Sequence, residues 1–173
     1  STYAPDDLKL LDYERDLGPP GSPPFTRAAY PEGYRERLWR IFQLSGHGTA
    51  EDEGERIRYL LKTGETGFIM EGDISSWLLY DVDDPEVVCR RDDVGLFGAP
   101  LMSLRDWEVI LDGIPIESTY CHPGGVTPMF SPFAHACYFS VAEKRGIPLS
   151  SLRGTGEGDF FLVDCDPRSF AQV

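Results

Sequence analysis

Helix-forming segments alternate with short apolar segments along much of this chain. Residues 49–64 and 103–113 each begin with a capping residue, carry apolar side chains at helical spacing and end at a glycine. Short apolar stretches at 66–70 and 114–120 follow these two helices and are predicted to be strands. Because helices that alternate with strands are typical of βαβ units, the sequence predicts an α/β domain with parallel strands.

The clearest helix lies in residues 128–146, where Gly146 ends the pattern. Its apolar side chains share one helical face and are Phe130, Phe133, Ala134, Cys137, Tyr138 and Val141. Further strand candidates are LRGTG (152–156) and FFLVDC (160–165), whereas residues 74–102 are expected to form loops. Only three or four strands are therefore visible, and a closed eightfold barrel needs roughly 250 residues. We expect either an open α/β layer or a partial (β/α) barrel-like domain.

Residues 1–24 are predicted to be an extended N-terminal arm or linker, and residues 25–173 the α/β domain. Residues 5–16 suit a short helix, and the proline-rich LGPPGSPPF that follows favours an extended conformation. EGYRERLWRIF (32–42) is compatible with another helix. Because the sequence begins with Ser rather than Met, we expect that it was excised from a longer protein.

Composition narrows the classes of function. With 29 acidic against 16 basic residues the net charge is −13, which argues against nucleic acid, because phosphate binding relies on clustered Lys and Arg. No apolar run approaches the roughly 20 residues of a bilayer span and no signal-peptide pattern is present, so we expect a cytoplasmic protein without a membrane partner. Four well-separated cysteines indicate neither a disulfide framework nor a zinc site, and no metal-ligand spacing appears. Basic residues are mostly Arg, a mark of GC-rich coding that points to an actinobacterial source.

The stretch STYCHPGGVTPMF (118–130) leads from a strand candidate into a helix and has three interpretations. It is a structural corner, in which Pro and Gly turn the backbone and Thr127 or Ser131 caps the helix. Alternatively, the backbone N–H groups of Gly124 and Gly125 bind a phosphate or a thioester oxygen. In the third interpretation, His122 is a general base whose ring is oriented by Glu157 or Asp159.

Neighbouring candidates have structural explanations. Cys121 is expected to point to the opposite face from His122, because strand side chains alternate. His47, in the Gly-His-Gly turn, is expected to pack like an aromatic ring, and His135 to face solvent.

Several blocks together resemble the amino-terminal, substrate-binding part of the methylmalonyl-CoA mutase family. They include GSPPFTRAAYPEGYRERLW, GHGTAEDEGERIRYLLKTGETG, YDVDDP, DVGLFGAPLMSLRDWEVILDGIP and LRGTGEGD, in this order over residues 20–160. The resemblance implies a (β/α)₈ barrel threaded by the pantetheine arm of an acyl-CoA, with a separate cobalamin domain. It further implies substrate contacts at Tyr30, Arg37 and Thr155. Asp73 and Tyr80 keep the family's loop pattern, where turn-forming and capping carboxylates are an equal alternative.

Departures from the family pattern argue against mutase chemistry by this chain alone. Phe42-Gln43-Leu44 stands where the family has Arg-Gln-Tyr, and Leu44 can neither orient a carboxylate nor bond a thioester carbonyl. The later barrel strands and the cobalamin domain are not represented. His122-x-x-Gly125 echoes a cobalamin-ligand motif, but Tyr120 stands where the motif has Asp. We therefore expect a truncated relative without cobalamin.

These observations predict a domain that recognises acyl thioesters on CoA or on an acyl carrier protein. It is expected to belong to a polyketide assembly line and to catalyse addition to, or proton transfer on, the acyl chain. Two alternatives stay open: a non-catalytic dimerisation or docking module, and a subunit fragment of a cobalamin-dependent acyl-CoA mutase. A homodimer or neighbouring synthase domains are the expected protein partners.

Overall fold

The computed structural model describes residues 5–35, 38–88, 94–124 and 127–158. The chain forms two compact units, Ser1–Arg40 and Ile41–Val173. The boundary between the two units lies after Arg40, whereas the sequence predicted an N-terminal arm that ends at residue 24.

The described residues of the first unit form short helical turns. They are a 3₁₀ turn at Pro5–Leu8, a π turn at Tyr13–Leu17 and a 3₁₀ turn at Gly33–Arg35. The predicted helix over residues 5–16 is therefore two pieces, and the predicted helix over 32–42 is wrong beyond its first turn. Short helices need an apolar face to bury, and Leu38 and Trp39 are both exposed here.

The second unit is built on a sheet of four parallel strands in the order β1-β2-β3-β4. The strands are β1 (Leu44–Ser45), β2 (Gly67–Met70), β3 (Tyr120–His122) and β4 (Arg153–Gly154). The helices between them are α1 (Ala50–Lys62), α2 (Ile74–Trp77), α3 (Pro85–Val88), α4 (Leu104–Ile110) and α5 (Phe130–Lys144), and a 3₁₀ turn at Leu149–Ser151 precedes β4. The predicted α/β class with parallel strands is confirmed.

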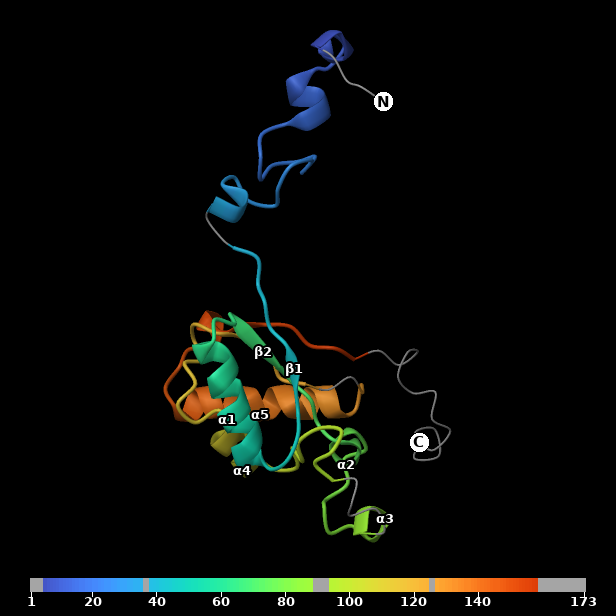
Figure 1. Cartoon of the computed structure of the whole chain (residues 1–173), viewed down its shortest axis with the longest axis vertical. Coiled ribbons are helices and arrows are strands. Elements are labelled where there is room, and N and C mark those ends of the chain that lie inside the picture. Colours follow the sequence, from blue (N-terminus) through green and yellow to red (C-terminus); the bar gives the residue numbers. More distant parts are fainter. Residues whose placement is uncertain (1–4, 36–37, 89–93, 125–126, 159–173) are drawn as a thin grey trace. The chain divides into compact units, whose positions relative to one another are not determined.

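The strands follow one another in space as they do in sequence, and α1, α4 and α5 pack side by side. Figure 1 shows α1 and α5 crossing beside β1 and β2. Phe68, Met70 and Cys121 of the strands share the apolar core with these helices. Parallel strands in sequential order, with helices packed on one face of the sheet, are the arrangement of a (β/α) barrel segment. We call the sheet face opposite α1, α4 and α5 the inner face.

Alternation along the strands decides which side chains reach each face. Phe68 pairs with Cys121 in register, and both are fully buried in the core. Leu44 pairs with Ile69, and Ile69 with His122, so these three side chains lie on the inner face. The largest buried core side chains include Trp107, Phe130, Leu101, Ile110 and Ile116.

Local signals at the helix ends are confirmed. The Thr49 side chain accepts from the Asp52 N–H while the Asp52 carboxylate accepts from the Thr49 N–H, which is the predicted capping box of α1. Ser103 and Asp106 form the same box at α4. At α5 the Thr127 hydroxyl accepts from the Phe130 N–H at 3.2 Å, as expected for one of the two proposed caps.

The predicted strand over 114–120 is wrong except at its last residue, because β3 begins at Tyr120. Pro115 has no N–H to donate, and the Ser118 N–H donates to the Pro115 carbonyl in a turn. Ile114 and Ile116 are buried in turns instead. The loop over 74–102 also contains α2, α3 and the buried Ala99 and Leu101, and the strand candidate over 160–165 lies outside the described residues.

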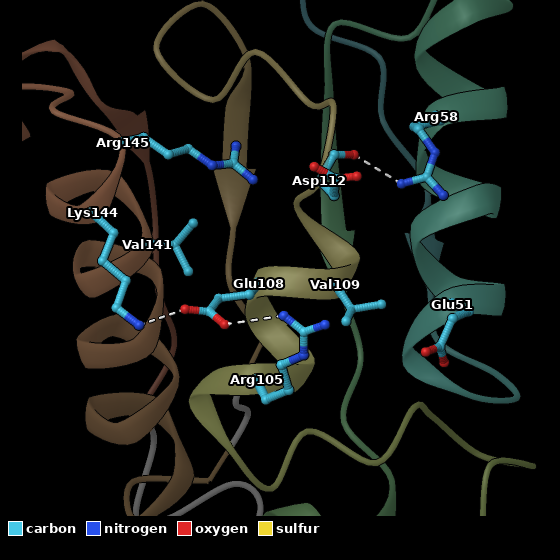
Figure 2. A pocket seen from close by; sticks show the side chains of 9 residues that line it. All are labelled: Glu51, Arg58, Arg105, Glu108, Val109, Asp112, Val141, Lys144 and Arg145. Atoms are coloured by element: carbon cyan, nitrogen blue, oxygen red, sulfur yellow. Dashed lines mark hydrogen bonds and ion pairs between the residues drawn. The ribbon is translucent and has the colours of Figure 1, made fainter.

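Charged side chains join the outer surfaces of α1, α4 and α5, around a groove of about 610 Å³ (Figure 2). Lys144 of α5 lies 2.5 Å from the Glu108 carboxylate of α4, and Arg58 of α1 donates to the Asp112 carbonyl at 2.9 Å. Arg145 donates to the carbonyls of Leu111 and Ile114. These cations are engaged in holding the helices together. In the part of the chain that the structure describes, no helix has the length and apolarity needed to cross a membrane.

Replacing the buried Phe68 tests the core. Phe68→Ala leaves a cavity between β2 and the helices, and we expect a loss of about 3–5 kcal/mol in the free energy of unfolding, measured by urea denaturation. Phe97, which is 68% exposed, provides the matched control, and Phe97→Ala should change stability by less than about 0.5 kcal/mol. Equal effects of the two substitutions would contradict this assignment of the core.

Candidate functional site

The carboxyl ends of the four parallel strands meet at one edge of the sheet. Ser45 is followed by Gly46 and His47, Met70 by Glu71, His122 by Pro123 and Gly124, and Gly154 by Thr155. Ligands of singly and doubly wound α/β folds bind at this edge. It is therefore the candidate functional site.

His122 ends β3 and is only 6% exposed. Its Nδ1 accepts the Gly124 N–H at 3.1 Å, so the neutral ring carries its proton on Nε2. Burial lowers the pKa of His122; Glu157 acts in the opposite direction, and His135 lowers it further. The ring is accordingly neutral near pH 7 and presents an Nε2–H donor. This tautomer suits His122 better to donate a hydrogen bond than to act as the general base expected from the sequence.

Glu157 lies beyond β4 with an exposed side chain. Its carboxylate raises the pKa of both His122 and Glu71, so the charge of Glu157 reaches each of these two side chains. The structure thus brings together His122 and Glu157, two of the residues selected from the sequence. Asp159, the third predicted catalytic residue, lies outside the described residues.

Glu71 was not selected from the sequence. Its Oε1 accepts from Trp77 Nε1 at 3.0 Å, and burial raises the pKa of Glu71 to about 7, opposed by the Trp77 bond and reinforced by Glu157. The signal that could have found it is a carboxylate placed directly after the buried strand GFIM. Trp77, however, comes from the helix after the strand, and its contact is visible only in the fold.

A second buried carboxylate, Glu53 of α1, lies under the end of β1. Ser45 Oγ donates to its Oε2 at 3.0 Å, and His47 Nδ1 lies 3.9 Å from the same oxygen. Its Oε1 is buried without a hydrogen-bond partner. Burial raises the pKa of Glu53 to about 7. The prediction that His47 packs like an aromatic ring is wrong, since its side chain is 58% exposed beside this carboxylate.

Asp73 supports the structural alternative. Asp73 is 1% exposed and caps α2, accepting from Ser75 Oγ at 2.6 Å and from the N–H and hydroxyl of Ser76. Gly95 N–H lies 3.4 Å from its other oxygen. The backbone N–H of the half-buried Tyr80 donates to the Ser75 carbonyl. Asp73 therefore holds the loop after β2 through contacts within the protein.

Gly124 is required by geometry. Its φ is +82°, and a Cβ there would lie 2.5 Å from the Met70 carbonyl oxygen, so a side chain has no room. The Gly124 N–H already donates to His122. This N–H therefore positions the imidazole ring instead of binding a ligand oxygen. Gly125, its predicted partner in substrate binding, lies outside the described residues.

Thr155 borders a pocket of about 290 Å³ between α5 and β4, which also includes His135, Phe139 and Arg153. The Thr155 side chain is exposed, and its N–H donates to the Cys121 carbonyl at 3.2 Å. The expectation that His135 faces solvent is wrong. It is half-buried, its Nδ1 lies 2.8 Å from the Ser131 carbonyl, and a Cβ on Gly156 would lie 2.3 Å from its ring.

Two of the remaining selected residues belong to the sequence of the first unit, and their predicted substrate contacts stay predictions. Tyr30 belongs to the first unit and is 46% exposed, and Arg37 lies outside the described residues. Cys121 is fully buried on the helix side beside Tyr138, as predicted from strand alternation. In the described ranges, no group of three or more His, Cys, Asp or Glu side chains is placed to hold a metal ion.

Comparison with known proteins decides the family. The family model for methylmalonyl-CoA mutase matches residues 1–163. The chain belongs to the methylmalonyl-CoA mutase family. It is 36% identical over 161 residues to the 2-hydroxyisobutanoyl-CoA mutase large subunit of Aquincola tertiaricarbonis, covering 91% of this chain and 27% of that protein.

Two further relatives give the same result. Human mitochondrial methylmalonyl-CoA mutase is 33% identical over 152 residues, covering 86% of this chain and 19% of the human protein. The methylmalonyl-CoA mutase large subunit of Streptomyces virginiae is 32% identical over 160 residues, covering 91% of this chain and 20% of that subunit. The chain therefore spans between 19% and 27% of the length of these relatives.

The resemblance to this family implied a cobalamin held by a separate domain, and the expectation of a chain without cobalamin stays a prediction. His122 is buried with Nδ1 engaged by Gly124, and His135 Nδ1 contacts the Ser131 carbonyl. The Nδ1 atoms of both rings are therefore engaged within the protein.

The buried Glu53 predicts a pH dependence of stability. Its pKa is raised in the folded state, so its stabilising contribution is full below about pH 4.5 and is lost as pH rises through about 7. Glu53→Gln cannot ionise. In urea denaturation we expect the variant to match the wild type near pH 4.5 and to exceed it at pH 8 by on the order of 1–3 kcal/mol.

Glu55, exposed on the same helix, supplies the control, and Glu55→Gln should leave the pH dependence of unfolding unchanged. A Glu53→Gln variant whose stability follows the wild type at both pH values would show that Glu53 ionises in the fold without cost.

Proposed function

We propose that this chain recognises acyl thioesters of pantetheine, on CoA or on an acyl carrier protein, at the carboxyl ends of its strands. The observation that carries the proposal is the neutral His122, which carries its proton on Nε2 at the ligand-binding edge of a mutase-family fold. The printed names of the relatives, 2-hydroxyisobutanoyl-CoA mutase and methylmalonyl-CoA mutase, support an acyl-CoA as ligand.

In this proposal the Nε2–H of His122 donates to the thioester carbonyl oxygen. Gly124 holds the ring through Nδ1, so the donor is oriented before the ligand arrives. Because the site is largely shielded from water, such a bond is stronger than at an exposed position. Glu71 and Glu157 lie beside it, with Glu71 near its midpoint of ionisation at neutral pH.

The proposal also includes the setting in which the domain works. The proline-rich first unit and the arginine-biased acidic composition suit a domain of an actinobacterial polyketide assembly line, working in the cytoplasm. The exposed Leu44, in the place of the family's tyrosine, supports chemistry other than the mutase rearrangement. β1 and β4 each pair on one side only within the described sheet, which supports association with a second copy or another subunit.

A second candidate function is that of one section of a cobalamin-dependent acyl-CoA mutase, completed by other chain segments. It is favoured by the relatives, whose printed names are those of acyl-CoA mutases and two of which are called large subunits. Their length, of which this chain covers 19–27%, leaves room for the parts that would hold the cofactor.

Binding of thioesters tests the first proposal. In isothermal titration with propionyl-CoA we expect His122→Ala to weaken binding by roughly tenfold, the value of one hydrogen bond of about 1–1.5 kcal/mol. Binding of free CoA, which has no carbonyl at the sulfur, should not change. His47→Ala removes an exposed histidine of the same edge and should bind propionyl-CoA like the wild type. No binding of propionyl-CoA by the wild type would refute the proposal.

Spectroscopy tests whether this chain by itself holds the cofactor of the second candidate. Adenosylcobalamin is added to the purified chain, and its ultraviolet–visible spectrum and retention on a desalting column are recorded. The first proposal predicts an unchanged spectrum and complete removal of the cofactor. Retained cofactor with a shifted spectrum would favour the mutase section instead.

A further inference from the structure

Glu71 and His122 share the inner face at the carboxyl edge of the sheet. Ile69 pairs with His122 in register, and because strand side chains alternate, Glu71 points to the same side as Ile69. Glu71 continues the ladder beyond β2, since its N–H donates to the Ser45 carbonyl at 2.7 Å. The two side chains therefore project from adjacent strands into the same region.

The backbone around Glu71 is held closely on both sides. A Cβ on Gly46 would lie 2.3 Å from the Glu71 carbonyl oxygen, and one on Gly124 would lie 2.5 Å from that of Met70. The side chain is fixed as well, because Trp77 Nε1 donates to Oε1 at 3.0 Å. Oε1 is thus the oxygen engaged within the protein.

Glu71 is close to its midpoint of ionisation at neutral pH. Burial raises the pKa of Glu71 to about 7, Trp77 lowers it and Glu157 raises it. The other ionisable groups at this edge are His122 and His135 toward β3 and α5, and His47 and Glu53 beside β1. A carboxyl group with a pKa near neutrality can both accept and return a proton.

We propose that Glu71 is a catalytic base that removes a proton from the carbon next to the carbonyl of a bound acyl thioester. This inference rests on the proposed function, in which His122 holds the carbonyl oxygen. The C–H bond breaks, its electron pair forms the C=C bond of an enolate, and the proton binds Oε2 of Glu71. The negative charge on the enolate oxygen faces the Nε2–H of the neutral His122.

The step needs no oxidant or co-reactant, because Glu71 returns the proton to the same carbon. In D₂O the returned proton is a deuteron, so the activity is exchange of the α-hydrogens. Propionyl-CoA, with two such hydrogens, is the probe. 2-Hydroxyisobutanoyl-CoA has no hydrogen on this carbon and is the matched ligand that should bind without exchange.

The experiment measures deuterium in propionyl-CoA by mass spectrometry after incubation with the full chain. Glu71→Gln keeps the size and the Trp77 bond but cannot accept the proton. We expect it to exchange roughly 10²–10⁴-fold more slowly than the wild type, with unchanged propionyl-CoA affinity by titration calorimetry. Glu143→Gln, at an exposed position of α5, should exchange like the wild type.

The pH profile distinguishes a base from a merely structural residue. Wild-type exchange should increase as pH rises through about 7, because the carboxylate is the active form. Trp77→Phe removes the N–H that stabilises this carboxylate, so its profile should move to higher pH. Wild-type protein that binds propionyl-CoA without exchanging it, or Glu71→Gln with a wild-type rate, would overturn this inference alone. Failure of the wild type to bind any thioester would overturn the proposed function and the inference with it.

Discussion

The pairing of β2 with β3 is the interaction on which the candidate site depends. These strands lie 50 residues apart in the sequence, yet their parallel register sets Ile69 against His122 and brings Glu71 to the same edge. Each strand has only three or four residues, so the pairing is stabilised mainly by Phe68, Met70 and Cys121, which bury their side chains against the helices. Because packing of the apolar face fixes the strand register, it also fixes which side chains lie on the inner face.

Two glutamates near the carboxyl edge have pKa values close to neutral for the same reason, burial, but in different settings. Glu53 lies on the helix side, with one oxygen bonded to Ser45 and the other without a partner. Glu71 lies on the inner face, bonded to an indole N–H and near His122 and Glu157. The first is a cost to stability at neutral pH, and the second is placed where a ligand can reach it.

Sequence reasoning succeeded where interactions are local. The capping boxes at Thr49 and Ser103 and the apolar face of α5 involve residues three to eleven positions apart, which sequence spacing records directly. It failed at residues 114–120, where Pro115 and a turn displaced the strand toward His122. His122 and Glu157 were found from the sequence, but Glu71 was not, because burial and the contact with Trp77 give it its character.

The sequence alone determined the α/β class, the boundaries of α1, α4 and α5, and the family, since periodicity, caps and motif order are properties of neighbouring residues. Only the tertiary structure decided the protonation and the hydrogen bonding of the side chains at the carboxyl edge of the sheet. The Gly124 amide selects the tautomer of His122, and Asp73 is committed to capping instead of to a ligand. Ionisation and hydrogen bonding depend on which distant segments exclude water from a side chain, and that is settled only when the strands and helices pack together.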